Sequence, residues 1–283
     1  YFELLPKFAV NYTTGAGDLY ATVTRGYKAG GFNTQIFSDI LQNKVKSALM
    51  NNAMGRPSTG GESSSYDEAS VTTYDPEYSW NYEVGGHLKF AEGRVDVDFA
   101  AFWIECRDQQ LTVFPEGQTT GRMMSNAGKS RSRGAELSLT WRAVEGLSIM
   151  GNYGYTNAKF VEFSDGVNDY AGNYIPYAPQ NTASATLSYT LSINSSWLDG
   201  ITLSATGRGA GKIYWNERND ISQPFYATLD SSLRFEGKRW AVDFWAKNIT
   251  NTRYDLFYFE SMGNAFLQRA RGASVGVRVN LDI

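Results

Sequence analysis

Hydrophobic and polar residues alternate strictly over the last ten positions of the chain. If this stretch is an extended strand, one face carries only branched aliphatic side chains, those of Val275, Val277, Val279, Leu281 and Ile283. The positions between them hold polar residues or glycine. Alternation with a period of two is typical of a β-strand that has an apolar medium on one side and water on the other.

The same alternation returns along the whole chain. Residues 183–191 alternate Ala, Leu and Tyr with Ser and Thr, and residues 136–141 alternate Glu, Ser and Thr with Leu and Trp. In residues 240–247 Trp245 departs from the rule, because it joins the polar side. We expect about eleven antiparallel strands, each long enough to cross a bilayer at a tilt, which takes about 9–11 residues. They cover residues 2–14, 18–30, 78–90, 94–114, 121–142, 147–163, 174–193, 201–217, 225–236, 240–259 and 266–283.

The lengths of the connections distinguish between two all-β folds. Strands of a soluble β-sandwich also alternate, so alternation alone leaves that fold open. Turn signals follow the first, third, fifth and ninth strands, at residues 15–17, 91–93, 144–146 and 236–238. The intervening connections include two long ones, residues 32–77 and 164–173. Short turns at one end and long loops at the other favour a transmembrane β-barrel. The longest connection is either a surface loop or a cap over a ligand cavity.

Composition agrees with this interpretation. No run of about 18 apolar residues is present, so no transmembrane helix is predicted. The mean hydropathy of -0.38 is not informative for a barrel, because polar positions facing the lumen cancel apolar positions facing lipid. Aromatic residues make up 14% of the chain, which suits the aromatic girdles of a barrel.

Several other chemistries are disfavoured. The formal net charge of -3 gives no basic footprint for nucleic acid. Cys106 is the single cysteine, so no intrachain disulfide is possible. His87 is the single histidine, which disfavours a Ser-His catalytic site, and we expect no metal site and no cofactor. The spacing of four acidic loop residues matches no EF-hand, and these are Asp67, Glu68, Asp75 and Glu77.

Several longer motifs resemble one known family. Residues 24–33 (TRGYKAGGFN), 77–83 (EYSWNYE) and 126–128 (NAG) running into 133–136 (RGAE) are similar to segments of TonB-dependent outer-membrane receptors. So are residues 153–158 (YGYTNA), 176–180 (PYAPQ) and 247–251 (KNITN). Because the motifs occur in the family's order, the resemblance covers essentially the whole chain.

The resemblance implies a barrel of about 22 strands, of which residues 1–283 supply the C-terminal half. It also implies an N-terminal plug and a TonB-binding segment before it, and neither segment nor a signal peptide is found in this sequence. Ile283 departs from the family, whose barrels usually end on an aromatic residue. Because an odd number of antiparallel strands cannot close without a parallel pair, we expect the other strands to come from a missing N-terminal portion or another chain.

The resemblance further implies a ligand cavity at the extracellular end. The arginine, aromatic and amide candidates for it are Arg107, Arg122, Tyr214, Trp215, Arg218, Tyr258, Gln268 and Arg269. We expect Arg131, Arg133 and Glu136 to form a lumen charge ladder that faces the plug.

The expected function is energised uptake of a scarce nutrient across the outer membrane of a Gram-negative bacterium, in contact with its lipid and with TonB. An iron–siderophore complex is the first expectation for the ligand, with haem, cobalamin and glycans left open. The alternatives are a passive porin-like channel and an outer-membrane enzyme.

Overall fold

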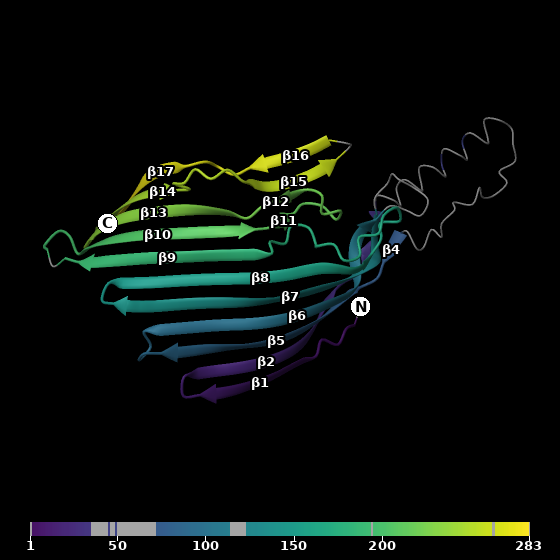
Figure 1. Ribbon diagram of the computed structural model, residues 1–283, viewed down its shortest axis with the longest axis horizontal. Helices are drawn as coiled ribbons and strands as arrows, with labels where there is room; N and C mark the ends of the chain where they lie inside the picture. Colours follow the sequence, from purple (N-terminus) through teal and green to yellow (C-terminus); the bar gives the residue numbers. More distant parts are fainter. Residues whose placement is uncertain are drawn as a thin grey trace.

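In the computed structural model, eleven strands form one antiparallel sheet in which each strand pairs with the next. The structure describes residues 2–34, 45, 49, 72–113, 123–193, 195–261 and 264–282. Figure 1 shows the sheet as one curved layer. Its strands are β1 (Lys7–Thr14), β2 (Gly17–Lys28), β5 (Glu77–Phe90), β6 (Val95–Val113), β7 (Met123–Val144), β8 (Leu147–Phe163), β9 (Asn181–Ser192), β10 (Gly200–Gly211), β13 (Tyr226–Gly237), β14 (Trp240–Lys247) and β17 (Ser274–Leu281).

The expected all-β class and the count of eleven antiparallel strands are confirmed. Three short two-stranded ribbons lie in the connections between these strands. They are β3 (Gly31–Phe32) with β4 (Thr73–Tyr74), β11 (Ile213–Tyr214) with β12 (Ser222–Gln223), and β15 (Asp255–Ser261) with β16 (Asn264–Arg269). All three ribbons lie at the same end of the sheet, to the right in Figure 1.

The last two predicted strands, residues 240–259 and 266–283, are longer than the strands of the structure. β14 ends at Lys247 and β17 begins at Ser274, so residues 248–273 form a long connection instead of continuing two strands. The backbone turns away because Asn248 and Asn251 have φ angles of 47° and 49°, and Asn readily adopts this left-handed conformation. A separate hairpin, β15–β16, projects from this connection.

The short connections all lie at the opposite end, and four of the five contain a predicted turn signal. They join β1 to β2, β5 to β6, β7 to β8, β9 to β10 and β13 to β14. In the β7–β8 turn, Gly146 has a φ angle of 78°, and a Cβ there would stand 2.2 Å from the carbonyl oxygen of Thr190. Only glycine fits such a position without moving the backbone. We call the two ends of the sheet the short-turn end and the long-loop end.

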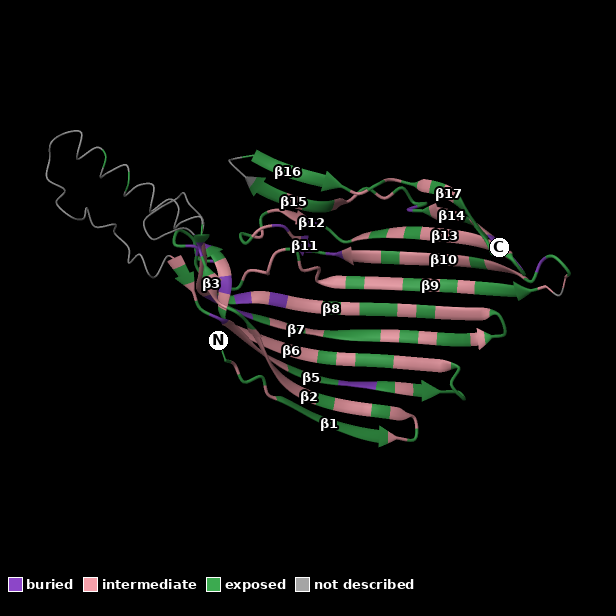
Figure 2. Ribbon diagram, turned by 180° about the vertical axis from the view of Figure 1, so that it is seen from behind, coloured by how far each residue is buried: buried purple, intermediate pink, exposed green. Residues whose placement is uncertain are grey.

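One face of the sheet carries most of the large apolar residues of its strands, and we call it the apolar face. The strand register aligns a row of large apolar residues across six neighbouring strands: Leu147, Tyr189, Leu203, Leu233, Phe244 and Val277. These side chains have no protein layer over them, since Leu203 is 54% exposed and Val277 57% exposed. Figure 2 shows the resulting alternation of exposed and intermediate positions along the strands.

The opposite face, which we call the polar face, is held together by hydroxyl pairs and ion pairs. Between β9 and β10, three pairs of hydroxyl oxygens lie 3.0 Å apart: Thr186–Thr206, Ser188–Ser204 and Thr190–Thr202. Ion pairs also lie on this face, namely Arg142–Asp96, Arg208–Asp230 and Arg234–Asp243, and His87 Nδ1 is hydrogen-bonded to Asp98 at 2.7 Å. Trp245, the exception to the alternation, lies over Gly276, which has no side chain to exclude it.

The one compact apolar cluster that packs within the described residues lies at the long-loop end. Phe160, Phe163, Tyr170 and Val113 are each at most 7% exposed and contact one another beneath the β8–β9 connection. No large side chain in the described part of the chain is fully buried. Within that part, no helix is long and apolar enough to cross a membrane. The sheet therefore lacks the continuous interior of a two-layer domain.

Candidate functional site

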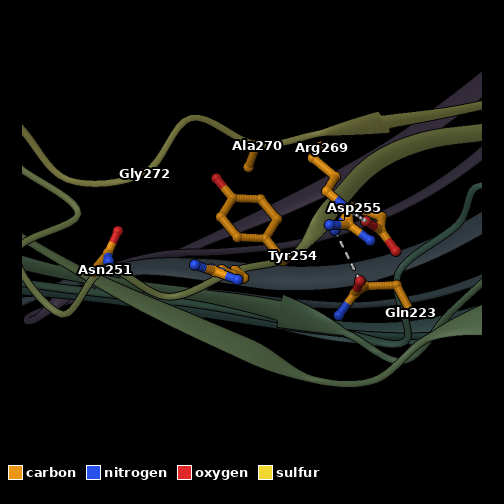
Figure 3. Close-up of a pocket in the computed structure, with 8 residues that line it drawn as sticks. Gln223, Asn251, Tyr254, Asp255, Arg269, Ala270 and Gly272 are labelled. Carbon is orange, nitrogen blue, oxygen red and sulfur yellow. Dashed lines mark hydrogen bonds and ion pairs between the residues drawn. The ribbon is translucent and has the colours of Figure 1, made fainter.

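A hollow of about 620 Å³ opens at the long-loop end, between β12, the start of β15 and the end of β16. Figure 3 shows the side chains that line it. They are Gln223, Asn251, Arg253, Tyr254, Asp255, Arg269, Ala270 and Gly272. Two arginines against one aspartate give this hollow a positive balance, so it favours an anionic group.

Asn248 fixes the loop that carries this site. Its side-chain amide donates to the carbonyl oxygens of Thr252 and Arg271, at 3.0 and 3.2 Å. Its Oδ1 accepts from the backbone N–H of Thr252 at 2.9 Å, while its own N–H donates to Asp230 at 2.8 Å. Asn248 is buried, with 7% of its surface exposed. Its hydrogen bonds satisfy backbone groups that no longer have a strand partner after β14 ends at Lys247.

Two of the lining residues are also held by specific partners. The backbone N–H of Asp255 donates to Oε1 of Gln223 at 2.9 Å, the bond drawn in Figure 3. Arg269 Nε lies 3.9 Å from the Asp255 carboxylate, and the arginine is largely exposed. Arg253 has no ion-pair partner among the residues that the structure describes. Arg253 is therefore available to an incoming anion, whereas Arg269 already has Asp255 as an ion-pair partner.

A second hollow, of about 530 Å³, adjoins the first on the polar face. Tyr254 lines both, and its ring stacks on Tyr226 with the centroids 3.8 Å apart and the planes 11° from parallel. Polar groups from β7, β8, β9 and β10 line the rest, including Glu136, Asn152, Ser184 and Arg208. The two hollows therefore adjoin at Tyr254, beside the stacked tyrosine pair, and we call them together the recess.

An aromatic cluster stands beside the recess. Tyr177 lies between Trp215 and Phe257, with ring centroids 5.6 and 5.5 Å away, and its hydroxyl donates to the carbonyl oxygen of Tyr258 at 2.9 Å. Burial, followed by the charge of Glu217, raises the pKa of Tyr177. Flat rings of this kind can stack on aromatic or conjugated ligands, while arginine can hold carboxylate or catecholate oxygens in bidentate fashion.

The β8–β9 connection next to this cluster is built around Asp165. Its carboxylate accepts hydrogen bonds from the backbone N–H groups of Val167 and Asn168, at 2.9 and 2.7 Å, and from the Tyr170 hydroxyl at 2.6 Å. Burial opposes ionisation of Asp165, but these bonds outweigh it and hold its pKa below the ordinary value. Burial and the bond to Asp165 raise the pKa of Tyr170 to about 12.

Six of the eight predicted ligand residues lie at the long-loop end in the ribbons and connections, although only Arg269 lines the recess. Tyr214 stacks on Tyr174 at 5.4 Å, and Trp215 is buried against Tyr177. Arg218 pairs with Asp220 and Glu260 at 3.2 and 3.6 Å. Tyr258 donates to Glu260 at 2.7 Å, and Gln268 is exposed on β16.

Arg107 does not lie where it was expected. The β5–β6 register runs without a break from Phe90–Val95 to Tyr78–Arg107, so Arg107 shares the apolar face with Val97 and Phe99. It therefore points away from the recess. Arg122 lies outside the described residues, as do Asp67, Glu68 and most of the 32–77 connection.

The expected lumen charge ladder of Arg131, Arg133 and Glu136 is also wrong. The β6–β7 pairing is regular from Trp141 to Ser130, so every second residue along this part of β7 lies on the same face. Glu136 is on the polar face, whereas Arg131 and Arg133 share the apolar face with Leu137 and Leu139. Counting every second residue along the strand, from Leu139 back to Arg131, would have placed both arginines on the apolar face from the sequence alone.

Seven of the eight residues that line the first hollow were not predicted, and these are Gln223, Asn251, Arg253, Tyr254, Asp255, Ala270 and Gly272. For Asn251, Arg253 and Tyr254 the sequence signal was their place in or just after the 247–251 motif, which was noted for its resemblance and not for its chemistry. Among the described residues, no group of three or more His, Cys, Asp or Glu side chains could hold a metal ion.

The chain matches the family model described as "TonB dependent receptor-like, beta-barrel" over residues 1–249. Among curated proteins, it is 29% identical over 208 residues to the pesticin receptor of Yersinia enterocolitica serotype O:8, covering 73% of this chain and 29% of that protein. It is 26% identical over 197 residues to the ferrichrome outer membrane transporter/phage receptor of Escherichia coli K12, covering 68% of this chain and 25% of that protein. The chain thus spans less than a third of the length of these relatives.

Among solved structures, the ferric yersiniabactin uptake receptor of Yersinia pestis superposes with a TM-score of 0.73 at 24% identity, over 99% of this chain and 37% of that chain. The siderophore receptor PiuA of Acinetobacter baumannii superposes with a TM-score of 0.68 at 19% identity, over 97% of this chain and 35% of that chain. At these identities the superpositions establish the fold.

Proposed function

The chain belongs to the TonB-dependent receptor-like β-barrel family of the outer membrane, and we propose that it takes part in the uptake of an iron–siderophore complex. The recess on the polar face is the observation that carries this proposal. It combines two arginines, the unpaired Arg253 and the exposed Arg269, with the stacked pair Tyr226–Tyr254. Anionic oxygens and conjugated rings are the groups that such a site would bind.

The ligands named for similar proteins support the choice of ligand class. The curated matches include a ferrichrome transporter and a ferrioxamine receptor, and the structural matches include receptors for ferric yersiniabactin and ferripyoverdine. In this proposal the protein binds its cargo and makes or breaks no bond in it. Energy for release into the periplasm comes through TonB.

We also propose that the eleven strands form part of a larger barrel that holds a plug. β1 and β17 are the two ends of the strand order, so each has a neighbour on one side only. Eleven antiparallel strands leave β1 and β17 running in the same direction, and joining them would require a parallel pair. An unpaired strand edge in lipid costs several kcal/mol for each unsatisfied group, so further strands would cover both edges.

A binding experiment tests the proposal. The natural polypeptide, extracted from outer membranes in detergent, is titrated calorimetrically with ferric yersiniabactin, ferrichrome and ferric citrate. We expect one of these complexes to bind, and Arg253→Ala to weaken its binding about tenfold or more, because a hydrogen bond to a charged group contributes ~1.5–3 kcal/mol. Arg94→Ala, which removes a cation at the short-turn end, is the matched control.

Two outcomes would count against the proposal. If no ferric complex binds and the gene's deletion leaves growth under iron limitation unchanged, the protein is not an iron receptor. Ion conductance through the unliganded protein in planar bilayers would instead favour a passive channel.

A further inference from the structure

Two neighbouring strands, β9 and β10, carry hydroxyl side chains along their polar face. On β9 every second residue from Thr182 to Ser192 is a serine or a threonine, and on β10 the residues are Thr202, Ser204 and Thr206. We call this set the hydroxyl strip. Each of its residues is half-buried or exposed. In a transmembrane barrel the polar face lines the lumen, so the strip is part of the lumen wall.

The hydroxyl strip is free of charge, although charged residues flank it. β9 contains no charged residue, and the single one of β10, Arg208, lies beyond the strip and lines the recess. Ion pairs stand on the polar face to either side, Arg142–Asp96 on β7 and β6 and Arg234–Asp243 on β13 and β14. Hydroxyl pairs stabilise a sheet, but ion pairs would serve that purpose as well, as they do on these strands. The lack of charge therefore indicates a second requirement at β9 and β10.

The hydroxyl strip begins at the recess and continues to the short-turn end. Its first two residues on β9, Thr182 and Ser184, line the second hollow of the recess. Its last, Ser192, ends β9 directly before the short connection to β10. At 3.2–3.4 Å per residue the strip is about 33 Å long. Because β9 has 12 residues, it is long enough to cross a bilayer at a tilt. The strip therefore connects the recess with the other side of the membrane.

The pairing of these hydroxyl groups leaves bonding capacity toward the lumen. The oxygens of Thr186 and Thr206 lie 3.0 Å apart, as do those of Ser188 and Ser204. In each pair one hydroxyl donates to the other, so one O–H and several lone pairs stay free. Rows repeat about every 6.6 Å, two residues along the strand. Hydrogen bonds between neutral groups are weaker than those to charges, and a series of weak sites lets a molecule enter and move on without being trapped.

We propose that the hydroxyl strip is the surface along which the ferric complex travels from the recess to the periplasmic end when the plug rearranges. Arginines hold the anionic oxygens of the complex in the recess. Along β9 and β10, the polar oxygen and nitrogen atoms on its outside then exchange hydrogen bonds from one row of hydroxyl groups to the next. This inference rests on the proposed function, because it needs both a ferric cargo and a plug.

The test separates transport from binding in the natural polypeptide. Cells with an intact TonB system receive radioactive iron as ferric yersiniabactin, ferrichrome or ferric citrate, and the maximal uptake rate is divided by the amount of receptor in the outer membrane. Calorimetry on the purified protein gives the affinity for the same complexes. The test variant combines Thr186→Val and Ser188→Ala, which removes two hydroxyl groups below the recess and nearly keeps their shape.

Two further variants serve as controls. Thr22→Val with Ser274→Ala removes the same two groups from the polar face of β2 and β17, and Ser274 lies in the same row as Thr186. Thr186→Ser with Ser188→Thr keeps both hydroxyl groups of the strip while changing their methyl groups.

We expect the test variant to bind its ferric complex with unchanged affinity and to import it about fivefold more slowly, because two steps of the path lose their hydrogen bonds. Both control variants should import at the natural rate. An unchanged rate in the test variant, or an equal loss in the β2 and β17 control, would overturn the proposal and leave the hydroxyl groups a role in stability alone.

The failure of the proposed function gives a different result. In that case the natural protein imports none of the three complexes, and the proposal of a path falls with it. If the test variant does not reach the outer membrane, Ser188→Ala alone gives the same comparison, with Ser274→Ala as its control.

Discussion

The two faces of this sheet obey different rules, although they share every strand. On the polar face, side chains meet specific partners, such as Arg234 with Asp243 at 3.3 Å and Asn248 with two carbonyl oxygens. On the apolar face the large residues touch mainly their neighbours in the sheet, and Val275 remains 80% exposed. On the polar face each position requires a particular side chain for its hydrogen bond or ion pair. On the apolar face a position requires only an apolar side chain.

The two faces therefore differ in how many residue types each position can accept. A lipid tail accepts any apolar shape, so Val, Leu, Phe and Tyr are interchangeable where they face it. A hydrogen bond to a backbone carbonyl accepts only a donor of the right length in the right place. Substitutions on the two faces should therefore differ in kind as well as in size.

The largest effect is expected from a charge placed on the apolar face. Leu139→Arg should destabilise the protein in lipid vesicles by about 2–4 kcal/mol, because lipid cannot solvate the guanidinium at mid-depth. Ser138→Arg, one position away on the polar face, is the matched control and should cost much less. Urea unfolding in vesicles measures both, and equal losses would contradict the assignment of the faces.

A smaller effect should follow from removing one polar anchor. Asn248→Ala deletes the bonds that the buried side-chain amide donates to the carbonyl oxygens of Thr252 and Arg271, at a cost of about 1–3 kcal/mol. We expect faster amide exchange in residues 249–254 and weaker ligand binding in the recess. Asn280→Ala, at an exposed position on the same face, should leave both unchanged.

The Asp165 turn should respond to pH in a defined direction. Its folded pKa lies below the ordinary value of 3.8, so its contribution is complete above about that pH and is lost as pH falls through the folded pKa. Asp165→Ala should cost about 1–2 kcal/mol locally at neutral pH. Tyr170→Phe removes only one of the three bonds and should cost less. Amide exchange of Val167 and Asn168 follows both variants, and protection that persists in Asp165→Ala would refute this role.

The smallest effect belongs to apolar exchanges on the apolar face. Leu203→Val should change stability by no more than about 0.5 kcal/mol, because its side chain is 54% exposed to the surrounding medium and fills no protein cavity. A loss of 2 kcal/mol or more, as at packed core sites, would mean that a protein layer covers this face.

Most of the sheet could be predicted from the sequence because a period of two is a local signal. Short turns carry their own glycines, and Gly146 illustrates why. The predicted strands at residues 240–259 and 266–283 contain β14 and β17 but are too long, because the apolar residues of the β15–β16 hairpin follow and precede them in the sequence. Asn248 and Asn251 turn the backbone between strand and hairpin.

The site was harder to predict. Arg253 and Tyr254 meet Arg269 only through the fold of a long connection, and no local pattern encodes that meeting. Asn33, Asn126 and Asn248 lie in motifs noted for their resemblance, and each binds backbone groups of a distant or turning segment. Arg107, Arg131 and Arg133 were predicted to face the lumen because they were grouped by their charge. Counting alternate residues along each strand would have placed them on the apolar face.

The most direct test of the central claim is a scan of lipid exposure along β7. Single cysteines at positions 136 to 141, in a variant lacking Cys106, carry an environment-sensitive fluorophore in vesicles that contain brominated lipid. The account predicts strong quenching at 137, 139 and 141 and weak quenching at 136, 138 and 140. Uniform quenching, or none at any position, would contradict a sheet with one face in lipid.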